Sequence, residues 1–225
     1  MNTEPVRKRI LAANDEAARA NRERFAASGT LVANLISSPG SGKTTLLSAT
    51  AERLHHRIRA AAIVGDVATE LDAERLRVAG LRAHQIVTGG ACHLDARMLA
   101  EALPWSGWPA VDLLFVENVG NLVCPSSYDL GEDFKVALVS TTEGHDKPFK
   151  YPAIFSRADV TLVTKIDLLP HVDFDLETVR GQVATLNRRA RVLEVSARTG
   201  EGLEAWCGLL TARLEAKQRA EAVPT

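Results

Sequence analysis

Residues 37–45, S-S-P-G-S-G-K-T-T, carry the clearest chemistry in this chain. They follow the apolar run 31–36, and glycines at Gly40 and Gly42 allow successive backbone N–H groups to turn inward around phosphate oxygens. Lys43 supplies a cation, and the Thr44 hydroxyl is suited to hold a magnesium ion on the terminal phosphates. The helix that begins near Thr44 points its positive end at the same anions. The predicted nucleotide contacts here are Gly40, Ser41, Gly42, Lys43, Thr44 and Thr45.

One position departs from the usual phosphate-loop pattern. The pattern opens with glycine, whereas this chain has Ser37. Serine can serve there if its φ stays negative, so we expect the loop to keep its mechanism.

A second pattern concerns the base of the nucleotide. Lys165 and Asp167 follow the apolar run 160–163 in T-K-I-D, and a later strand ends at Ser196-Ala197. A carboxylate offers only acceptors, so Asp167 can bind the N1–H and the exocyclic amine of guanine together, and adenine has no such pair of donors. The position that is usually asparagine in such loops is Thr164, which removes a carboxamide that would brace the loop. We therefore predict GTP as the nucleotide, although a solvent-exposed loop with an Asp near a Lys is common.

Two carboxylates end apolar strands, Asp66 and Glu117. Phosphate-loop proteins need an acidic strand end for magnesium, so both are candidate Mg²⁺ ligands and, with Lys43, candidate catalytic residues. Gly120 follows Glu117 by three residues and could offer its N–H to the γ-phosphate in a loop that moves when that phosphate leaves. The simpler alternative is that both acids only cap the segments that follow them.

Thiols and one imidazole form a third group. Cys92 and His93 are expected at the start of a helix, directly after a strand, and Cys124 follows the Glu117 loop. Such a set suits zinc, nickel or copper(I), but three ligands leave the shell incomplete, and a two-fold dimer could supply more. The alternative of buried inert thiols stays open. Cys207 differs, because it shares an apolar helical stripe with Trp206 and is expected to pack in the core.

The totals exclude several classes of protein. With 225 residues, 27 Lys+Arg and 28 Asp+Glu, the chain fits one α/β domain with a short extension, and its charge balance favours neither nucleic acid nor an anionic membrane. No apolar run approaches the roughly 20 residues of a membrane span. The odd count of three cysteines argues for reduced thiols, so we expect a cytoplasmic protein.

These groups must be positioned by alternating strands and helices. Strands are predicted at 31–36, 60–64, 83–87, 111–116, 135–140, 160–164 and 192–195. Helices are predicted at 3–27, 46–56, 70–79, 94–103, 151–156, 173–187 and 201–217. Helical crossovers indicate a mostly parallel sheet of about seven strands with helices on both faces, the phosphate-loop NTPase architecture. We divide the chain into an N-terminal helical arm (1–29), a GTPase domain (30–217) and a tail (218–225).

In addition, the sequence resembles the HypB family of GTPases that insert nickel into [NiFe] hydrogenases. The segments that carry the resemblance span nearly the whole chain: N-D-E-A-A-R-A-N-R at 14–22, S-S-P-G-S-G-K-T-T at 37–45, G-D-V-A-T-E-L-D-A-E-R at 65–75, C-H-L-D-A at 92–96, E-N-V-G-N-L-V-C-P at 117–125 and T-E-G-H-D-K-P-F-K-Y-P at 142–152. The chain lacks the N-terminal cysteine cluster and histidine-rich run of some members. It also lacks the proline between Cys and His that is typical of the urease GTPases.

The resemblance implies a nucleotide-dependent homodimer with a nickel or zinc site at its interface, built from Cys92, His93 and Cys124. It also implies that Lys147 or Lys150 reaches nucleotide across that interface, and that a second nickel/zinc metallochaperone and the hydrogenase large-subunit precursor are partners. The expected activity is slow GTP hydrolysis to GDP and phosphate, and no arginine is identified that would speed it. Three alternatives stay open: a urease-type nickel accessory GTPase, a metal-binding dimer in which the nucleotide is only structural, and an ATP-dependent ligase or kinase on the same scaffold.

Overall fold

A computed structural model describes residues 4–55, 57–67, 70–105 and 110–221. Residues 1–3 of the expected N-terminal arm, residue 56 of the second expected helix and residues 222–225 of the expected tail lie outside this described part. All strand pairs in the described chain are parallel, and the seven strands have the order β3-β2-β4-β1-β5-β6-β7. The predicted fold class is therefore confirmed.

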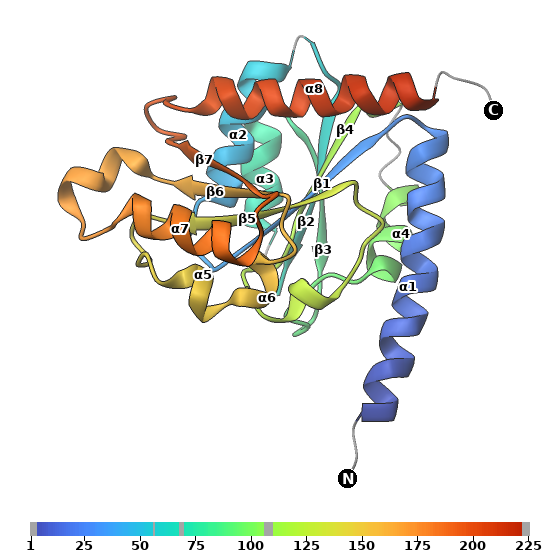
Figure 1. Cartoon of the computed structure of the whole chain (residues 1–225). Helices are drawn as coiled ribbons and strands as arrows, with labels where there is room; N and C mark the ends of the chain where they lie inside the picture. Colours follow the sequence, from blue (N-terminus) through green and yellow to red (C-terminus); the bar gives the residue numbers. More distant parts are fainter. Residues whose placement is uncertain (1–3, 56, 68–69, 106–109, 222–225) are drawn as a thin grey trace.

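The bounds of the elements follow the predicted alternation (Figure 1). The strands are β1 (Leu31–Ser37), β2 (Ala60–Asp66), β3 (Arg82–Val87), β4 (Leu113–Glu117), β5 (Phe134–Ser140), β6 (Val160–Thr164) and β7 (Arg191–Val195). The helices are α1 (Glu4–Ala27), α2 (Lys43–Leu54), α3 (Leu71–Val78), α4 (Ala96–Trp105), α5 (Lys147–Lys150), α6 (Pro152–Phe155), α7 (Leu176–Leu186) and α8 (Leu203–Glu221), with two short 3₁₀ helices, η1 (Cys124–Ser127) and η2 (Ile166–His171).

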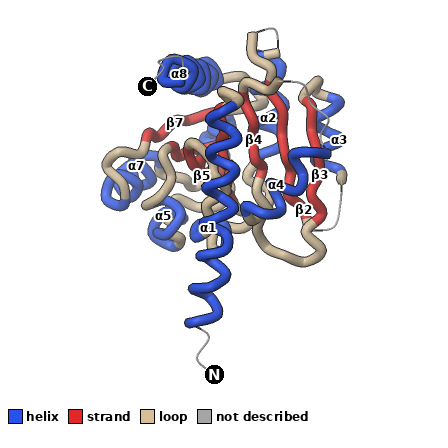
Figure 2. The backbone as a smooth tube through the Cα atoms, turned by 90° about the vertical axis from the view of Figure 1, so that its right-hand side faces the viewer, coloured by secondary structure: helices blue, strands red, loops and turns tan. Residues whose placement is uncertain are grey.

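Helices cover both faces of the sheet, because the strands carry apolar side chains on both sides. In β1, Leu31 and Leu35 join a cluster with residues of α2, α3 and α8. Val32 points the other way, into a cluster with residues of α1 and α4, and Ile36 does so into a cluster with α6 and α7. Figure 2 shows α1 and α4 lying together across one face, and in Figure 1 α8 runs along the top of the view, beside α2.

Several helix boundaries differ from the predictions by one to four residues, and three of these differences have an evident cause or consequence. The helix expected from residue 94 begins at Ala96, because the Asp95 carboxylate accepts the Met98 N–H and acts as its N-cap. Cys92 and His93 consequently lie in a turn before the helix. The helix expected from residue 173 begins at Leu176 for the same reason, since Asp175 caps it through the N–H groups of Glu177 and Thr178.

The third difference affects the expected tail. Helix α8 continues to Glu221 instead of ending at 217, so residues 218–221 are helical. Its apolar stripe is buried against α2 as expected, with Cys207 9% exposed and Trp206 donating a 3.1 Å hydrogen bond to Thr50.

The N-terminal helix is packed onto the domain over its second half. Asn21 Nδ2 donates to the carbonyls of Ala96 and Leu130, and Asn14 Nδ2 donates to Asp129 O. Buried side-chain amides of this kind tie α1 to α4 and to the loop before β5. The second half of α1 therefore covers the sheet, and its first half projects beyond the domain (Figure 2).

Candidate functional site: a phosphate cavity beside a thiol cluster

The phosphate loop lies between β1 and α2. Gly40 and Gly42 have φ angles of 74° and 95°, which other residues rarely adopt. Lys165 is the sole non-glycine residue with positive φ in the described chain, so Ser37 meets the condition expected of it. The Ser37 hydroxyl accepts a 2.9 Å hydrogen bond from Lys43 Nζ and bonds the Ser41 hydroxyl. Burial lowers the Lys43 pKa, and the Glu117 charge opposes that effect.

The two acidic strand ends lie near this loop. Register places Glu117 beside Leu35 of β1 and Val64 of β2, so the end of β4 sits between the phosphate loop and Asp66. Glu117 is 3% exposed, and its Oε1 accepts a 2.8 Å hydrogen bond from Thr44 Oγ1. Burial raises the pKa of Glu117 to about 7, and the positive charge of Lys43 limits the rise.

The donor set at this point fits magnesium. Glu117 Oε2 is buried and has no hydrogen-bond partner within the described chain, which leaves a carboxylate oxygen available in a polar cavity. The Thr44 hydroxyl adjoins it, and Asp66 lines the same cavity. Oxygen ligands of this kind, completed by water and phosphate, are those Mg²⁺ prefers.

The loop after β4 touches the phosphate loop. A side chain at Gly120 would place its first carbon 2.9 Å from Pro39 Cγ and 3.0 Å from Pro39 N, closer than such atoms approach. Only glycine permits this contact without a shift of one loop. Gly120 therefore lies where the sequence places it, against the phosphate loop.

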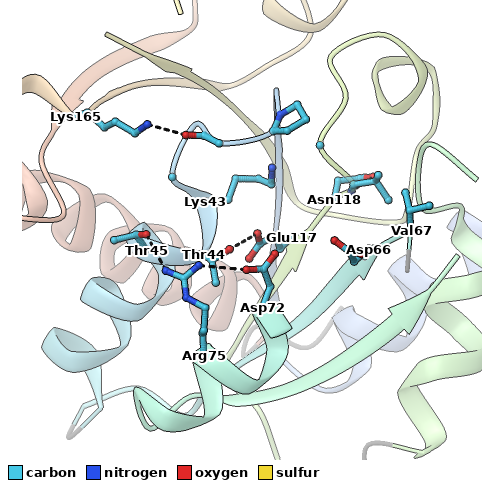
Figure 3. A pocket seen from close by; sticks show the side chains of 16 residues that line it. Lys43, Thr44, Thr45, Asp66, Val67, Asp72, Arg75, Glu117, Asn118 and Lys165 are labelled. Carbon is cyan, nitrogen blue, oxygen red and sulfur yellow. Dashed lines mark hydrogen bonds and ion pairs between the residues drawn. The ribbon is translucent and has the colours of Figure 1, made fainter. Parts of the chain in front are cut away.

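A cavity of about 500 Å³, here named the phosphate cavity, connects these groups (Figure 3). Its lining includes residues to which the sequence assigned no role, among them Val67, Asp72, Arg75 and Asn118. Asp72 and Arg75 extend from α3 toward the Glu117 carboxylate. Both residues follow the acidic end of β2 in the chain, and this position was the signal that could have identified them. From sequence, the 65–75 segment was noted only for its family resemblance.

Three of the residues predicted to read the base, Lys165, Asp167 and Ala197, line a separate cavity of about 240 Å³, the base cavity, whereas Ser196 is buried behind it. Asp167 in η2 accepts a 2.6 Å hydrogen bond from the Ser196 hydroxyl and lies 3.3 Å from Arg198 Nε. Ala197 lines the same cavity. Lys165 Nζ donates a 2.7 Å hydrogen bond to Gly40 O, so its stem joins the base cavity to the phosphate loop.

Thr164 does the bracing that the sequence analysis considered lost. Its Oγ1 donates a 2.7 Å hydrogen bond to Ser41 O in the phosphate loop. A short hydroxyl suffices because β6 ends close to the loop, so the expectation of a missing brace was wrong.

Lys147 lies near the nucleotide loop of its own chain. Its Nζ donates a 3.3 Å hydrogen bond to Ser38 Oγ and pairs with Glu143 at 3.5 Å. Lys150 is exposed and pairs with Asp146. Neither lysine is among the residues that line the two cavities.

The thiol and imidazole groups predicted as metal ligands converge. Cys92, His93 and Cys124 form a group, here named the thiol cluster, whose ligand atoms all lie within 4.8 Å of one another. Cys92 is exposed and the other two are partly buried, and the His93 ring packs 3.9 Å from the Tyr128 ring. Three soft or borderline donors at this spacing suit Ni²⁺ or Zn²⁺ with a position left for a further ligand.

Two asparagines tie this cluster to the Glu117 loop. Asn118 Oδ1 accepts hydrogen bonds from the N–H groups of Leu94 and Val119, both at 3.0 Å. Asn121 Nδ2 donates to Cys92 O at 3.1 Å. The thiol cluster and the phosphate cavity therefore share the loop that runs from Glu117 to Cys124.

The family model of the CobW/HypB/UreG nucleotide-binding domain matches residues 31–194. Hydrogenase maturation factor HypB of Azotobacter chroococcum is 49% identical over 211 residues, which are 94% of this chain and 69% of that protein. The chain belongs to the HypB family.

Two solved HypB structures are also similar to this HypB-family chain. HypB from Archaeoglobus fulgidus has a TM-score of 0.84 at 41% identity, covering 91% of this chain and 100% of that one. HypB from Helicobacter pylori in complex with nickel has a TM-score of 0.86 at 38% identity, covering 95% and 99%. The resemblance stated from sequence is thus confirmed, and the chain contains a nucleotide-binding domain of this family. The described helices include none that is both long and apolar enough to cross a membrane.

Proposed function

We propose that the chain is a GTP-hydrolysing metallochaperone that binds nickel at Cys92, His93 and Cys124 and inserts it during maturation of [NiFe] hydrogenase. One observation carries this proposal: a single loop begins at Glu117, in the phosphate cavity, and ends at Cys124, in the thiol cluster. A change at either end is transmitted to the other through a short, hydrogen-bonded segment.

Hydrolysis uses the groups around the phosphate loop. Lys43 and the loop N–H groups hold the β- and γ-phosphates, and Thr44 and Glu117 hold Mg²⁺. When bound, that ion neutralises charge that develops on the phosphate oxygens. Asp66 lies at the end of β2, where a carboxylate can orient the attacking water or bind Mg²⁺ through water. Because hydrolysis depends on positioning, the intrinsic rate should be slow, on the order of 10⁻⁴ to 10⁻² per second.

The preference for guanine is assigned to Asp167. Its carboxylate accepts from Ser196 and turns toward the base cavity, where it would accept two hydrogen bonds from guanine. Lys165, Ser196 and Ala197 complete this part of the site.

The metal is cargo in this proposal. Three ligands from one chain leave room for groups from a second copy in a nucleotide-dependent homodimer, and loss of the γ-phosphate would relax the Glu117–Cys124 loop and lower metal affinity. Nickel would come from or pass to a second metallochaperone and reach the hydrogenase large-subunit precursor. All three cysteines are free thiols, as a reducing cytoplasm would maintain them.

The deciding experiment is a nickel and zinc titration of protein loaded with GTP or GDP, read by calorimetry with the dimer fraction measured in parallel. We expect nickel affinity to differ at least about fivefold between the two nucleotides, the lower end of typical coupling between sites. The Lys43→Ala variant should lose this difference while keeping its metal site. Identical nickel uptake with both nucleotides would overturn the coupling, and normal nickel delivery by Lys43→Ala would favour a structural nucleotide.

A further inference from the structure

The phosphate cavity contains a cation that the proposed mechanism does not use. Within the described chain, three cationic residues line this cavity: Lys43, Arg75 and Lys165. Lys43 belongs to the phosphate loop, and Lys165 donates to Gly40 O and faces the base side. Arg75 comes from α3 and has no counterpart in the phosphate-loop pattern.

Arg75 is close to the groups that bind phosphate. Its Nη2 lies 3.5 Å from Thr45 Oγ1, in the first turn of α2 and directly after Thr44. Figure 3 shows the guanidinium between Thr45 and Asp72. Its positive charge lowers the pKa of Glu117, whereas the charge of Asp72 raises it, so both α3 side chains act on the proposed magnesium position.

The guanidinium is held loosely. Its pair with Asp72 is 3.4 Å long, the contact with Thr45 lies at the outer limit of a hydrogen bond, and the side chain is 60% exposed. Weak contacts of this kind cost little to exchange for charge-assisted hydrogen bonds to phosphate oxygens, which a planar guanidinium makes in pairs.

We propose that Arg75 is an arginine supplied in cis to bound GTP, donating to its phosphate oxygens during hydrolysis, with Asp72 as its partner when the cavity holds no nucleotide. In this step the water oxygen forms a bond to the γ-phosphorus, and the bond from that phosphorus to the oxygen bridging the β-phosphate breaks. GDP keeps the electron pair, and the protons of the water go to the released phosphate and to solvent. Arg75 stays protonated and stabilises charge that gathers on the bridging and terminal oxygens.

This inference rests on the proposed GTPase function and is tested by single-turnover hydrolysis together with GTP affinity. Arg75→Ala should lower the hydrolysis rate on the order of 20-fold, the difference between phosphate-loop GTPases with and without an arginine in cis. GTP affinity should change less than about threefold, because the contact strengthens as charge develops.

Arg77→Ala is the matched control. Arg77 lies on the same helix, but its side chain donates to Ala83 O and does not line the cavity. If Arg77→Ala slows hydrolysis as much as Arg75→Ala, the loss reflects a weakened α3 and the inference fails. An unchanged rate in Arg75→Ala also overturns it.

A mixing experiment separates cis from trans action. Arg75→Ala protein mixed with Lys43→Ala protein should hydrolyse GTP no faster than the mean of the two alone, since each chain that binds GTP productively lacks its own arginine. Recovery toward the wild-type rate would show action across a dimer and overturn the cis assignment. Absence of hydrolysis in the wild-type protein would instead contradict the proposed function, so the two failures are distinguishable.

Discussion

The Thr44 hydroxyl donates a 2.8 Å hydrogen bond to Glu117 Oε1, joining the first turn of α2 to the carboxyl end of β4. Both groups are those proposed to bind Mg²⁺, and they face each other across the cavity. The second oxygen of Glu117 is buried without a partner within the described chain. A preformed pair of this kind needs little rearrangement to bind the ion, and it connects the phosphate loop to the loop that ends at Cys124.

Glu117→Gln tests the magnesium assignment. The amide nearly preserves shape but removes the negative charge, so Mg²⁺-dependent GTP hydrolysis should fall on the order of 100-fold, as is typical when one charge-stabilising group is lost. Phosphate release measured against Mg²⁺ concentration checks this. Glu101→Gln, on the exposed side of α4, should behave like the wild type. A normal Mg²⁺ dependence in Glu117→Gln would reject the assignment.

The stability of the metal-free and nucleotide-free protein should depend on the same residue. Burial raises the pKa of Glu117 from its ordinary 4.5 to about 7. Between these two pH values, the folded protein holds a proton on Glu117 that the unfolded chain has released. The stability contributed by this group is complete below pH 4.5 and is lost as pH rises through 7. Denaturant unfolding across this range should show Glu117→Gln gaining stability relative to the wild type as pH rises. A pH-independent difference would contradict the shift.

Base preference tests Asp167. Inosine triphosphate lacks the exocyclic amine of guanine, and a hydrogen bond to a charged group contributes about 1.5–3 kcal/mol. It should therefore bind about 10- to 100-fold more weakly than GTP. Asp167→Asn should remove most of this discrimination, and Asp173→Asn, an exposed neighbour, should keep it. ATP binding as tight as GTP binding would contradict the assignment.

The thiol cluster predicts selective effects on metal binding. Cys124→Ala should weaken nickel or zinc affinity at least about tenfold while leaving GTP affinity nearly unchanged. Cys207→Ala is the control, because Cys207 packs in the core and its loss should lower stability without altering metal affinity. Competition with a colorimetric chelator measures both. Equal metal affinity in Cys124→Ala would reject the ligand assignment.

The brace on the phosphate loop has a matched control on its own strand. Thr164→Val removes the hydrogen bond to Ser41 O and should lower the free energy of unfolding by about 1 kcal/mol and weaken GTP binding. The hydroxyl of Thr161 is buried without a partner within the described chain, so Thr161→Val should be neutral or stabilising. Equal losses from both changes, measured by urea unfolding, would show that the brace contributes nothing.

The sequence alone determined the fold class, the phosphate loop and the strand ends on which the site residues lie. These features are local: burial on both faces gives continuous apolar strands, and glycine, lysine and threonine act within a few residues of one another. The sequence also predicted which residues converge at the thiol cluster and at the base cavity, since the carboxyl ends of parallel strands share one edge of the sheet.

Only the tertiary structure decided which side chains from other elements enter the cavity. Arg75 is one of two arginines in a polar helix, and nothing local separates it from Arg77. The order β2-β4-β1 and the packing of α3 on α2 place one guanidinium against Thr45 and turn the other to β3. The same holds for Thr164, whose hydroxyl reaches Ser41 because two strand ends are adjacent. Contacts between residues far apart in the chain depend on strand order and helix packing, which no local pattern of residues specifies.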